Sequence, residues 1–212
     1  MPLKAAIVPV TPFQQNCTLL WDETSKAGAV VDPGGDLERI EEAIAKLGLR
    51  PEKILLTHGH VDHAAGAAEL KERLGGVPIE GPHIADKFLL EGLAAQAAAL
   101  GQFSARNVVP DRWLKEGDGV DAAGTTFLVL HCPGHSPGSV VMVDRGQRFA
   151  LVGDVLFRGS IGRTDFPYGD HAALIDAIKT KLLPLGDAIV FICGHGPMSS
   201  FGEERKHNPF LQ

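Results

Sequence analysis

Short apolar runs, separated by turn-forming residues, recur along most of the chain and predict β-strands. The runs that fit this pattern are residues 5–10, 17–21, 27–32, 53–57, 77–80, 125–131, 139–143, 148–152 and 188–193. Apolar residues three or four positions apart predict helices with one buried face. These helices are expected over residues 36–47, 64–74, 86–100 and 171–183. The end of the chain, residues 202–212, is expected to form a surface turn or short helix followed by a tail.

Two of the expected helices begin after a residue suited to N-capping. Asp36 follows the turn sequence Asp32-Pro33-Gly34-Gly35, and Asp170 precedes the helix expected from His171. An aspartate in this position accepts a hydrogen bond from a backbone N–H of the first helical turn. In each half of the chain strands come first and a helix follows, and no Pro-, Gly- or Ser-rich linker interrupts this order. We therefore expect a single domain, residues 1–212, with mixed sheets covered by helices on the outside.

Composition and charge narrow the classes of partner. Hydrophobic residues make up 44% and charged residues 22% of the 212 residues, which is typical of a water-soluble globular chain. The net charge of −6 argues against a broad surface for nucleic acid or anionic membrane, because such surfaces are basic. No apolar stretch approaches the ~20 residues of a membrane span, and no signal peptide is recognisable. Together with the three scattered cysteines, these features predict a cytoplasmic monomer or small homo-oligomer without nucleic-acid or membrane partners.

Candidate chemistry begins in the stretch Thr57-His58-Gly59-His60-Val61-Asp62-His63, directly after an apolar run. Residues two apart on an extended strand end point the same way, so His58 and His60 can reach one metal ion. A turn after Val61 would send Asp62 and His63 toward a second site. Imidazole suits zinc or iron, and a carboxylate adds the negative charge that a divalent ion requires. The structural alternative is a polar cluster before a helix, with Asp62 as its N-cap.

Three later strands each end in a further potential ligand next to glycine. These ligands are His135, Asp154 and His195, and a flanking glycine lets the backbone approach an ion closely. Seven ligands exceed the needs of one tetrahedral ion but suit two adjacent ions, zinc, iron or manganese, that share a carboxylate. The expected partition is His58, His60 and His135 on the first ion, Asp62, His63 and His195 on the second, and Asp154 between them.

The order His58-x-His60-x-Asp62-His63, His135, Asp154, His195 resembles the signature of the metallo-β-lactamase superfamily across essentially the whole chain. This resemblance implies an α/β (α+β) fold, the αββα sandwich, in which two mixed sheets lie face to face with helices outside and metals at one edge. Residues 131–138, 162–166 and 204–211 are similar to glyoxalase II, and the chain looks most like its short bacterial relatives. Long glyoxalase II proteins continue into a helical part that helps to bind glutathione, whereas this chain stops at Gln212.

The resemblance implies a binuclear hydrolase of 2-hydroxyacyl glutathione thioesters, such as S-lactoylglutathione, with Asp62 and Asp154 in the catalytic positions. A hydroxide bridging the two ions would attack the carbonyl carbon. Arg163 is the candidate for a substrate carboxylate, because its planar guanidinium suits bidentate pairing. Tyr168 is a second candidate for substrate contact. The structural alternatives are a surface ion pair for Arg163 and a packed ring for Tyr168.

Other activities on the same fold remain open at this point. Persulfide dioxygenases resemble the chain at residues 162–166, and they are thought to use one iron held by the equivalents of His58, His135 and Asp154. A lactonase is a further alternative, with Tyr168 as an assisting group. The net negative charge disfavours a nuclease. A non-catalytic binding module would be expected to lack some of the metal ligands.

Overall fold

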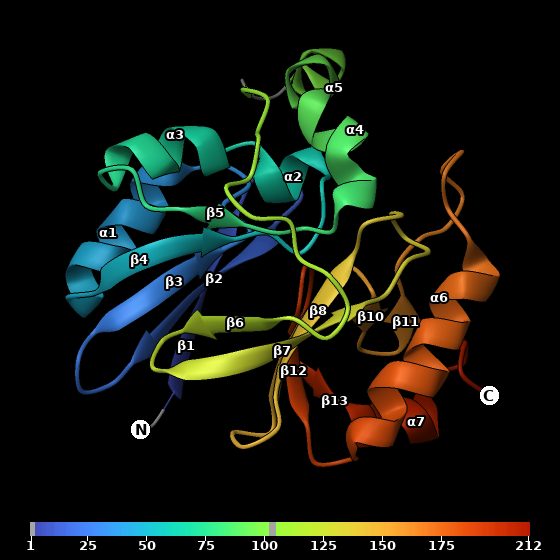
Figure 1. Ribbon diagram of the computed structural model, residues 1–212. Coiled ribbons are helices and arrows are strands. Elements are labelled where there is room, and N and C mark those ends of the chain that lie inside the picture. The colour runs from blue at the N-terminus through green and yellow to red at the C-terminus, as the bar shows by residue number, and fades with distance from the viewer. Residues whose placement is uncertain (1–2, 102–104) are drawn as a thin grey trace.

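Two β-sheets lie face to face, and helices cover their outer faces (Figure 1). The computed structural model describes residues 3–101 and 105–212. This architecture confirms the αββα sandwich expected from the sequence. Because the candidate ligands follow strand ends, the direction of each strand decides which of them can meet.

The first sheet contains five strands in the order β1-β2-β3-β4-β5. The strands are β1 (Leu3–Val10), β2 (Gln15–Asp22), β3 (Ala27–Val31), β4 (Arg50–Leu55) and β5 (Ile79–Glu80). Neighbours pair antiparallel from β1 to β3 and parallel from β3 to β5, so the sheet is mixed. The C-terminal ends of β3 and β4 therefore lie at the same edge as the start of β2.

The second sheet has six strands in the order β13-β12-β9-β8-β7-β6. They are β6 (Gly119–Ala122), β7 (Thr125–His131), β8 (Val140–Asp144), β9 (Phe149–Gly153), β12 (Val190–Cys193) and β13 (Ser199–Ser200). Strand β12 is parallel to β9, and the other neighbours are antiparallel. Strands β7, β9 and β12 consequently run in one direction and end at one edge. A small hairpin of β10 (Leu156–Phe157) and β11 (Ser160–Ile161) follows β9.

Helices flank both sheets (Figure 1). The α-helices are α1 (Leu37–Leu47), α2 (Val61–Ala64), α3 (Ala67–Arg73), α4 (Lys87–Glu91), α5 (Leu93–Leu100), α6 (His171–Ala177) and α7 (Phe201–His207). Two short 3-10 helices are η1 (Ile84–Asp86) and η3 (Leu183–Leu185), and a π-helical segment is η2 (Ile178–Leu182). Figure 1 shows α1 and α3 on the side of the first sheet, and α6 and α7 on the side of the second.

Alternation of side chains along each strand produces three apolar layers. On β2, Leu19 packs toward the helices α1 and α3, whereas Leu20 packs between the two sheets. On β12, Ile192 joins the layer between the sheets, and Phe191 packs against α6 and α7. Burial of both faces explains why these strands appear in the sequence as continuous apolar runs rather than as alternating ones.

Several predicted elements differ in detail from the observed ones. The helix predicted over 64–74 is two helices, because the N–H of Gly66 donates to Pro33 O, 2.9 Å away. The helix predicted over 86–100 divides at Gly92 into α4 and α5. The sequence prediction missed β6, β10, β11 and β13, because two to four residues are too few to produce a recognisable period.

The two predicted N-caps behave differently. The side chain of Asp170 accepts a hydrogen bond from the N–H of Ala173 at 2.9 Å, which confirms it as the cap of α6. Asp36 occupies the N-cap position of α1, as predicted, but its carboxylate makes no cap bond to the helix. Instead Asp36 accepts from the N–H of Thr11 at 2.8 Å and ties the β1–β2 turn to the start of α1.

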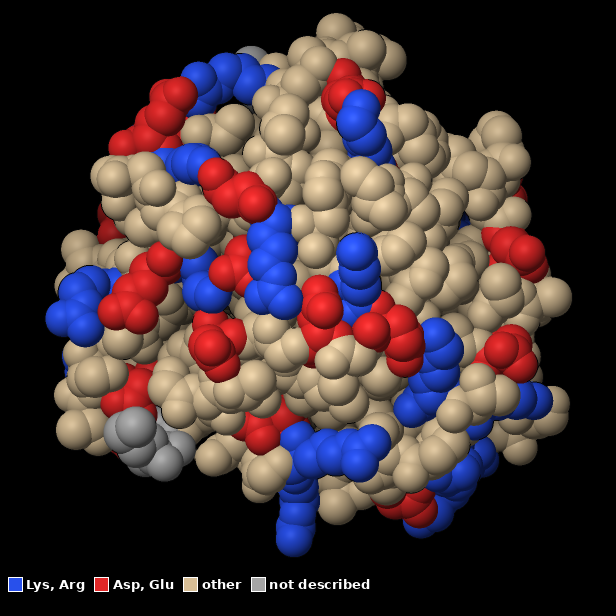
Figure 2. All heavy atoms as spheres, viewed as in Figure 1, with Lys and Arg blue, Asp and Glu red and all other residues tan. Residues whose placement is uncertain are grey.

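Charged side chains of both signs lie next to one another over much of the face seen in Figure 2. Arg73 illustrates the pattern, since its guanidinium pairs with Glu38, Glu41 and Glu69. Exposed pairs of this kind contribute little to stability individually. None of the helices in the described part of the chain is long and apolar enough to cross a membrane.

A buried polar cluster attaches α7 to the β10–β11 hairpin. Glu204 accepts hydrogen bonds from the N–H of Gly159 and from Asn208 Nδ2, each at 2.8 Å. Asn208 Nδ2 also donates to Ser160 O at 2.9 Å. Glu204 is 3% and Asn208 0% exposed, so this cluster exchanges few hydrogen bonds with water. It holds the chain segment that leads away from Asp154.

We predict that Asn208→Ala lowers the free energy of unfolding by about 2–3 kcal/mol, because it leaves buried acceptors without a donor. Denaturant unfolding measured by circular dichroism tests this value. Lys206→Ala, at an exposed position of α7 two residues before Asn208, is the matched control, and it should change stability by less than about 0.5 kcal/mol. Equal stability of the two variants would contradict the structural role given to Asn208.

Candidate metal centre

Strand ends from both sheets bring the seven candidate ligands to one edge of the sandwich. The chain leaves β4 and reaches His58 and His60, and α2 then carries Asp62 and His63. In the second sheet, the segments after β7, β9 and β12 carry the remaining three ligands, His135, Asp154 and His195. An antiparallel bridge between Gln15 and His195 joins the two sheets at this edge.

Three histidines form the first group, defined as His58, His60 and His135. His60 Nδ1 lies 3.0 Å from His58 Nε2 and 2.9 Å from His135 Nε2. All three rings are buried. Their ring nitrogens therefore converge on one small region, as the sequence spacing of His58 and His60 predicts.

The second group consists of Asp62, His63 and His195. His195 Nε2 lies 3.3 Å from His63 Nε2 and 3.2 Å from Asp62 Oδ2. His63 is fully buried, while the side chains of Asp62 and His195 keep 16% and 29% exposure. This group is therefore the one that solvent and small molecules reach more readily.

Asp154 lies between the two groups. Its Oδ1 is 3.4 Å from His63 Nε2 in the second group, and its Oδ2 is 3.5 Å from His135 Nε2 in the first. Oδ2 also lies 3.6 Å from His195 Nε2 of the second group, so the carboxylate is close to histidines of both groups. Gly194 makes this approach possible, since a Cβ at that position would lie 2.0 Å from Asp154 Oδ1.

Hydrogen bonds on the outer side of the rings fix which nitrogen faces inward. His135 Nδ1 donates to Arg163 O at 2.9 Å, and His195 Nδ1 donates to Phe13 O at 3.2 Å. A carbonyl oxygen can only accept, so in a neutral ring the inward Nε2 carries a lone pair. His63 follows the same rule, because its Nδ1 donates to the carboxylate of Asp32 at 2.9 Å.

Asp32 also orients His58 through Thr57. The hydroxyl of Thr57 donates to Asp32 Oδ2 at 2.6 Å and is 3.1 Å from His58 Nδ1. The hydroxyl proton is already committed to Asp32, so Thr57 accepts from His58 Nδ1 and leaves the lone pair of Nε2 directed inward. Outer partners of this kind set the tautomer and orientation of metal-binding histidines.

The electrostatics differ between the two groups. Burial lowers the pKa of His60 to about 3, and burial with neighbouring imidazoles holds the pKa of His58 well below its usual value. Burial also opposes the charged form of His63 and His195, but the carboxylates of Asp62 and Asp154 outweigh it and raise the pKa of both rings above the usual value. Burial opposes the ionisation of Asp62 and Asp154, but nearby histidines keep the pKa of both carboxyls below the usual range. Neutral imidazole and carboxylate are the protonation states that coordinate a divalent cation.

A buried oxygen without a hydrogen-bond partner among the described residues indicates that a cation fits between the two groups. Asp154 Oδ1 is buried and accepts no hydrogen bond from any residue that the structure describes. Such an atom is costly unless a ligand or ion satisfies it. Inward lone pairs of the histidines surround the same region, and a cation would satisfy all of these groups together. The donor set of imidazoles and carboxylates therefore fits divalent transition-metal ions.

The two residues predicted to contact substrate lie beside the first group. The hydroxyl of Tyr168 is 2.9 Å from His60 Nε2, on the outer side of that ring. The exposed guanidinium of Arg163 pairs with Asp165 through two bonds of 2.7 Å and lies over the ring of Phe166, 4.5 Å from its centroid. Both structural alternatives, the ion pair and the packed ring, are thus present in the structure.

The remaining histidines lie outside the two groups. His131 Nε2 donates to Pro137 O at 2.8 Å, and the His131 ring stacks on His83 with centroids 4.0 Å apart. His171 begins α6 at the surface, and His207 on α7 is 3.9 Å from Glu203. These contacts and positions give the four histidines structural or surface roles.

Sequence reasoning missed the residues that orient the ligands. The sequence pattern places Asp32 at the end of the run 27–32 and in the turn after it, without a role toward the candidate ligands, although it follows a strand as they do. Thr57 was treated as the end of an apolar run. Asn16 holds the His195 loop by donating to Cys193 O and Gly196 O, at 3.0 and 2.9 Å. Only the position of Asp32 after a strand could have been recognised in advance.

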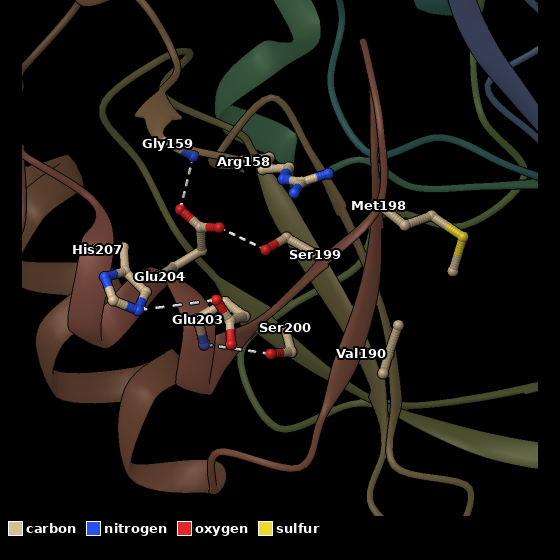
Figure 3. Close-up of a pocket in the computed structure, with 9 residues that line it drawn as sticks. All are labelled: Arg158, Gly159, Val190, Met198, Ser199, Ser200, Glu203, Glu204 and His207. Atoms are coloured by element: carbon tan, nitrogen blue, oxygen red, sulfur yellow. Dashed lines mark hydrogen bonds and ion pairs between the residues drawn. The ribbon is translucent and has the colours of Figure 1, made fainter.

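A hollow of about 540 Å³ lies between the β10–β11 hairpin, β12, β13 and α7 (Figure 3). Arg158, Met198 and Val190 are on its walls, and none of the seven candidate ligands lines it. Figure 3 shows the carboxylate of Glu204 on the wall of this hollow, hydrogen-bonded to Gly159 and Ser199. The hollow is therefore separate from the two ligand groups.

Known proteins with related sequences also support a metal-binding site in this chain. The family model of the metallo-beta-lactamase superfamily matches residues 10–195. The hydroxyacylglutathione hydrolase GloC of Haemophilus influenzae is 48% identical over 206 residues, which cover 97% of this chain and 96% of that protein.

Solved structures also superpose on the chain over nearly its whole length. The B3 metallo-beta-lactamase BLEG-1 is 34% identical with a TM-score of 0.89, and the match covers 98% of this chain and 99% of that one. TTHA1623, solved in a di-iron-bound form, is 39% identical with a TM-score of 0.87, and the match covers 97% and 100%. The chain therefore belongs to the metallo-beta-lactamase superfamily and is a metal-dependent hydrolase.

Proposed function

We propose that this protein is a binuclear metal-dependent thioesterase that cleaves 2-hydroxyacyl glutathione thioesters such as S-lactoylglutathione. The observation that carries the proposal is the position of Asp154, whose carboxylate lies between two groups of three candidate ligands and within 3.6 Å of histidines in both. A hydrolase with one ion would have no use for the second group. The relative named hydroxyacylglutathione hydrolase supports the substrate class.

Two divalent ions, zinc, iron or manganese, would supply Lewis acidity and lower the pKa of a coordinated water toward ~7. The residues of the chain provide the setting for this chemistry. Asp154 contributes negative charge between the two groups, and the inward lone pairs of His58, His63 and His135 hold each position. Asp62 is ionised and partly exposed, so its carboxylate can accept a hydrogen bond from the attacking water and orient it.

The protein's own side chains argue against a covalent nucleophile. Burial raises the pKa of the thiols of Cys132 and Cys193 to about 12, so neither forms a thiolate at neutral pH. The hydroxyls of Ser136 and Ser139 are buried and 2.7 Å from each other. A thiol leaving group has a pKa near ~8.5 and departs as a thiolate without a strong general acid. Thioester hydrolysis is therefore well matched to a site without a strong general acid.

Arg163 is the residue that we assign to a carboxylate of the glutathione moiety. It follows the Asp154 segment, and its backbone oxygen contacts His135, so its side chain begins next to the first group. The guanidinium is exposed and held by Asp165, which is exposed as well. An exposed pair is weak, so a substrate carboxylate can replace Asp165 at little cost. Tyr168, beside His60, is assigned to the same side of the substrate.

We predict that Asp154→Asn lowers thioesterase activity by orders of magnitude and weakens metal retention, because an amide lacks the negative charge between the ions. Activity assays and elemental analysis after dialysis measure both effects. His171→Ala removes an exposed histidine outside the two groups, and it should leave both nearly unchanged. If the two variants behaved alike, the assignment of ligands would be wrong.

We predict hydrolysis of S-lactoylglutathione and no oxygen uptake with glutathione persulfide. Release of free thiol and an oxygen electrode measure the two reactions on zinc-loaded and iron-loaded protein. Zinc has no redox chemistry, so a hydrolase works with either metal, whereas a dioxygenase requires iron. Oxygen uptake by the iron form, without thioester cleavage by either form, would contradict the proposal.

A further inference from the structure

We propose that Asp86, which is not one of the candidate ligands, is the positioning residue of the first group. This inference rests on the proposed metal centre and assigns a role to a buried carboxylate that the hydrolytic chemistry leaves unused. Asp86 is 0% exposed and lies at the end of η1, where α4 begins. It acts by holding together the two loops that carry His58, His60 and His135.

The carboxylate of Asp86 accepts hydrogen bonds from both of these loops. Its Oδ2 accepts from the N–H of Gly59 at 2.8 Å, and Gly59 is the residue between His58 and His60. Its Oδ2 also accepts from the hydroxyl of Ser136 at 2.7 Å, and its Oδ1 from the N–H of Gly138 at 2.5 Å.

These contacts place one anchor beside every ligand of the first group. Gly59 directly follows His58 and precedes His60, and Ser136 directly follows His135. The three ring nitrogens lie within 4.8 Å of one another, so a small separation of the two loops would open the group. One carboxylate that bonds both loops resists this separation directly.

The packing around Asp86 indicates that the two loops are held close together. A Cβ at Gly138 would lie 2.6 Å from Asp86 Cγ, so only glycine allows the loop after His135 to approach so closely. A buried carboxylate is costly unless hydrogen bonds satisfy it. Asp86 is satisfied entirely by loop donors, and therefore its burial and the closeness of the two loops depend on each other.

The histidine tautomers do not depend on Asp86. His135 is oriented by Arg163 O, and His58 by Thr57. Loss of Asp86 should thus leave each ring with the correct inward nitrogen but spread the nitrogens apart. The expected consequence is weaker metal binding by the first group, with the second group affected less, because Asp62, His63 and His195 make no contact with Asp86 among the interactions of the described residues.

Asp86→Asn tests this role with little change of volume. An amide keeps one acceptor oxygen, but its NH₂ group faces a donor that the carboxylate had bonded. We expect the metal dissociation constant of the first group to rise about 10–100-fold, as for other groups that orient metal ligands. Competition with a chromophoric chelator, using zinc, measures this constant. The same measurement in the His195→Ala background, where the second group lacks a ligand, isolates the first group.

Asp144→Asn is the matched control. Asp144 is also buried, at 6% exposure, and it accepts from a hydroxyl (Thr125, 2.6 Å) and a backbone N–H (Gln147, 3.0 Å). It ends β8, whereas the start of that strand bonds Thr57 O near the metal centre, so Asp144 lies at the opposite end. This variant should lower thermal stability and leave both metal dissociation constants unchanged.

Unchanged metal binding in Asp86→Asn, or an equal loss in Asp144→Asn, would overturn the role of Asp86. Ser136→Ala keeps the carboxylate and removes one of its three donors, so it should weaken metal binding in the same direction but less, even if Asp86→Asn folds poorly. A wild-type protein that binds one ion would contradict the binuclear function. The effect of Asp86→Asn on that single site would still decide the present proposal.

Discussion

The structure depends on the convergence of nitrogen and oxygen lone pairs at one edge of two packed sheets. Five imidazoles and two carboxylates meet there, and a cation between them would satisfy the inward lone pairs together with the unpartnered Oδ1 of Asp154. Asp154 is the most constrained of them, because it is buried between both groups and one of its oxygens accepts no hydrogen bond among the described residues. The packing of the two sheets holds these side chains close together.

The two sheets position different parts of the site. In the second sheet, the shared direction of β7, β9 and β12 brings three ligands to the same edge. In the first sheet, β4 delivers the histidine-rich segment, and β3 is followed by Asp32, which orients His63 and Thr57. The apolar layer between the sheets fixes their separation, so the site is assembled on rigid elements. Carbonyl, hydroxyl and carboxylate partners then set the orientation of each ring.

The strands and the candidate ligands could be located in the sequence because each follows from local pattern, whereas the αββα arrangement was implied by the resemblance to the superfamily. The strands are short apolar runs, and His58, His60, Asp62 and His63 lie within six residues of one another. The ligands after β7, β9 and β12 are recognisable by the glycine beside each of them. Local pattern could not reveal Asp86, because its partners Gly59 and Ser136 are 27 and 50 residues away in the chain.

The same limit applies to the boundaries of the elements. The break at Gly66 depends on a hydrogen bond to Pro33, and the failure of Asp36 to cap α1 depends on Thr11, which is 25 residues away. Pairs of this kind form only when the sheets are assembled. The sequence pattern therefore predicts the existence of elements better than their ends, and ligands better than the groups that orient them.

The central claim is that Asp154 joins two metal positions in one site, and the metal content of the protein tests it most directly. Elemental analysis of protein purified without chelator, before and after supplementation with zinc, iron or manganese, gives the number of ions per chain. The account predicts about two. A single tightly held ion, unchanged by supplementation with any of the three metals, would contradict it.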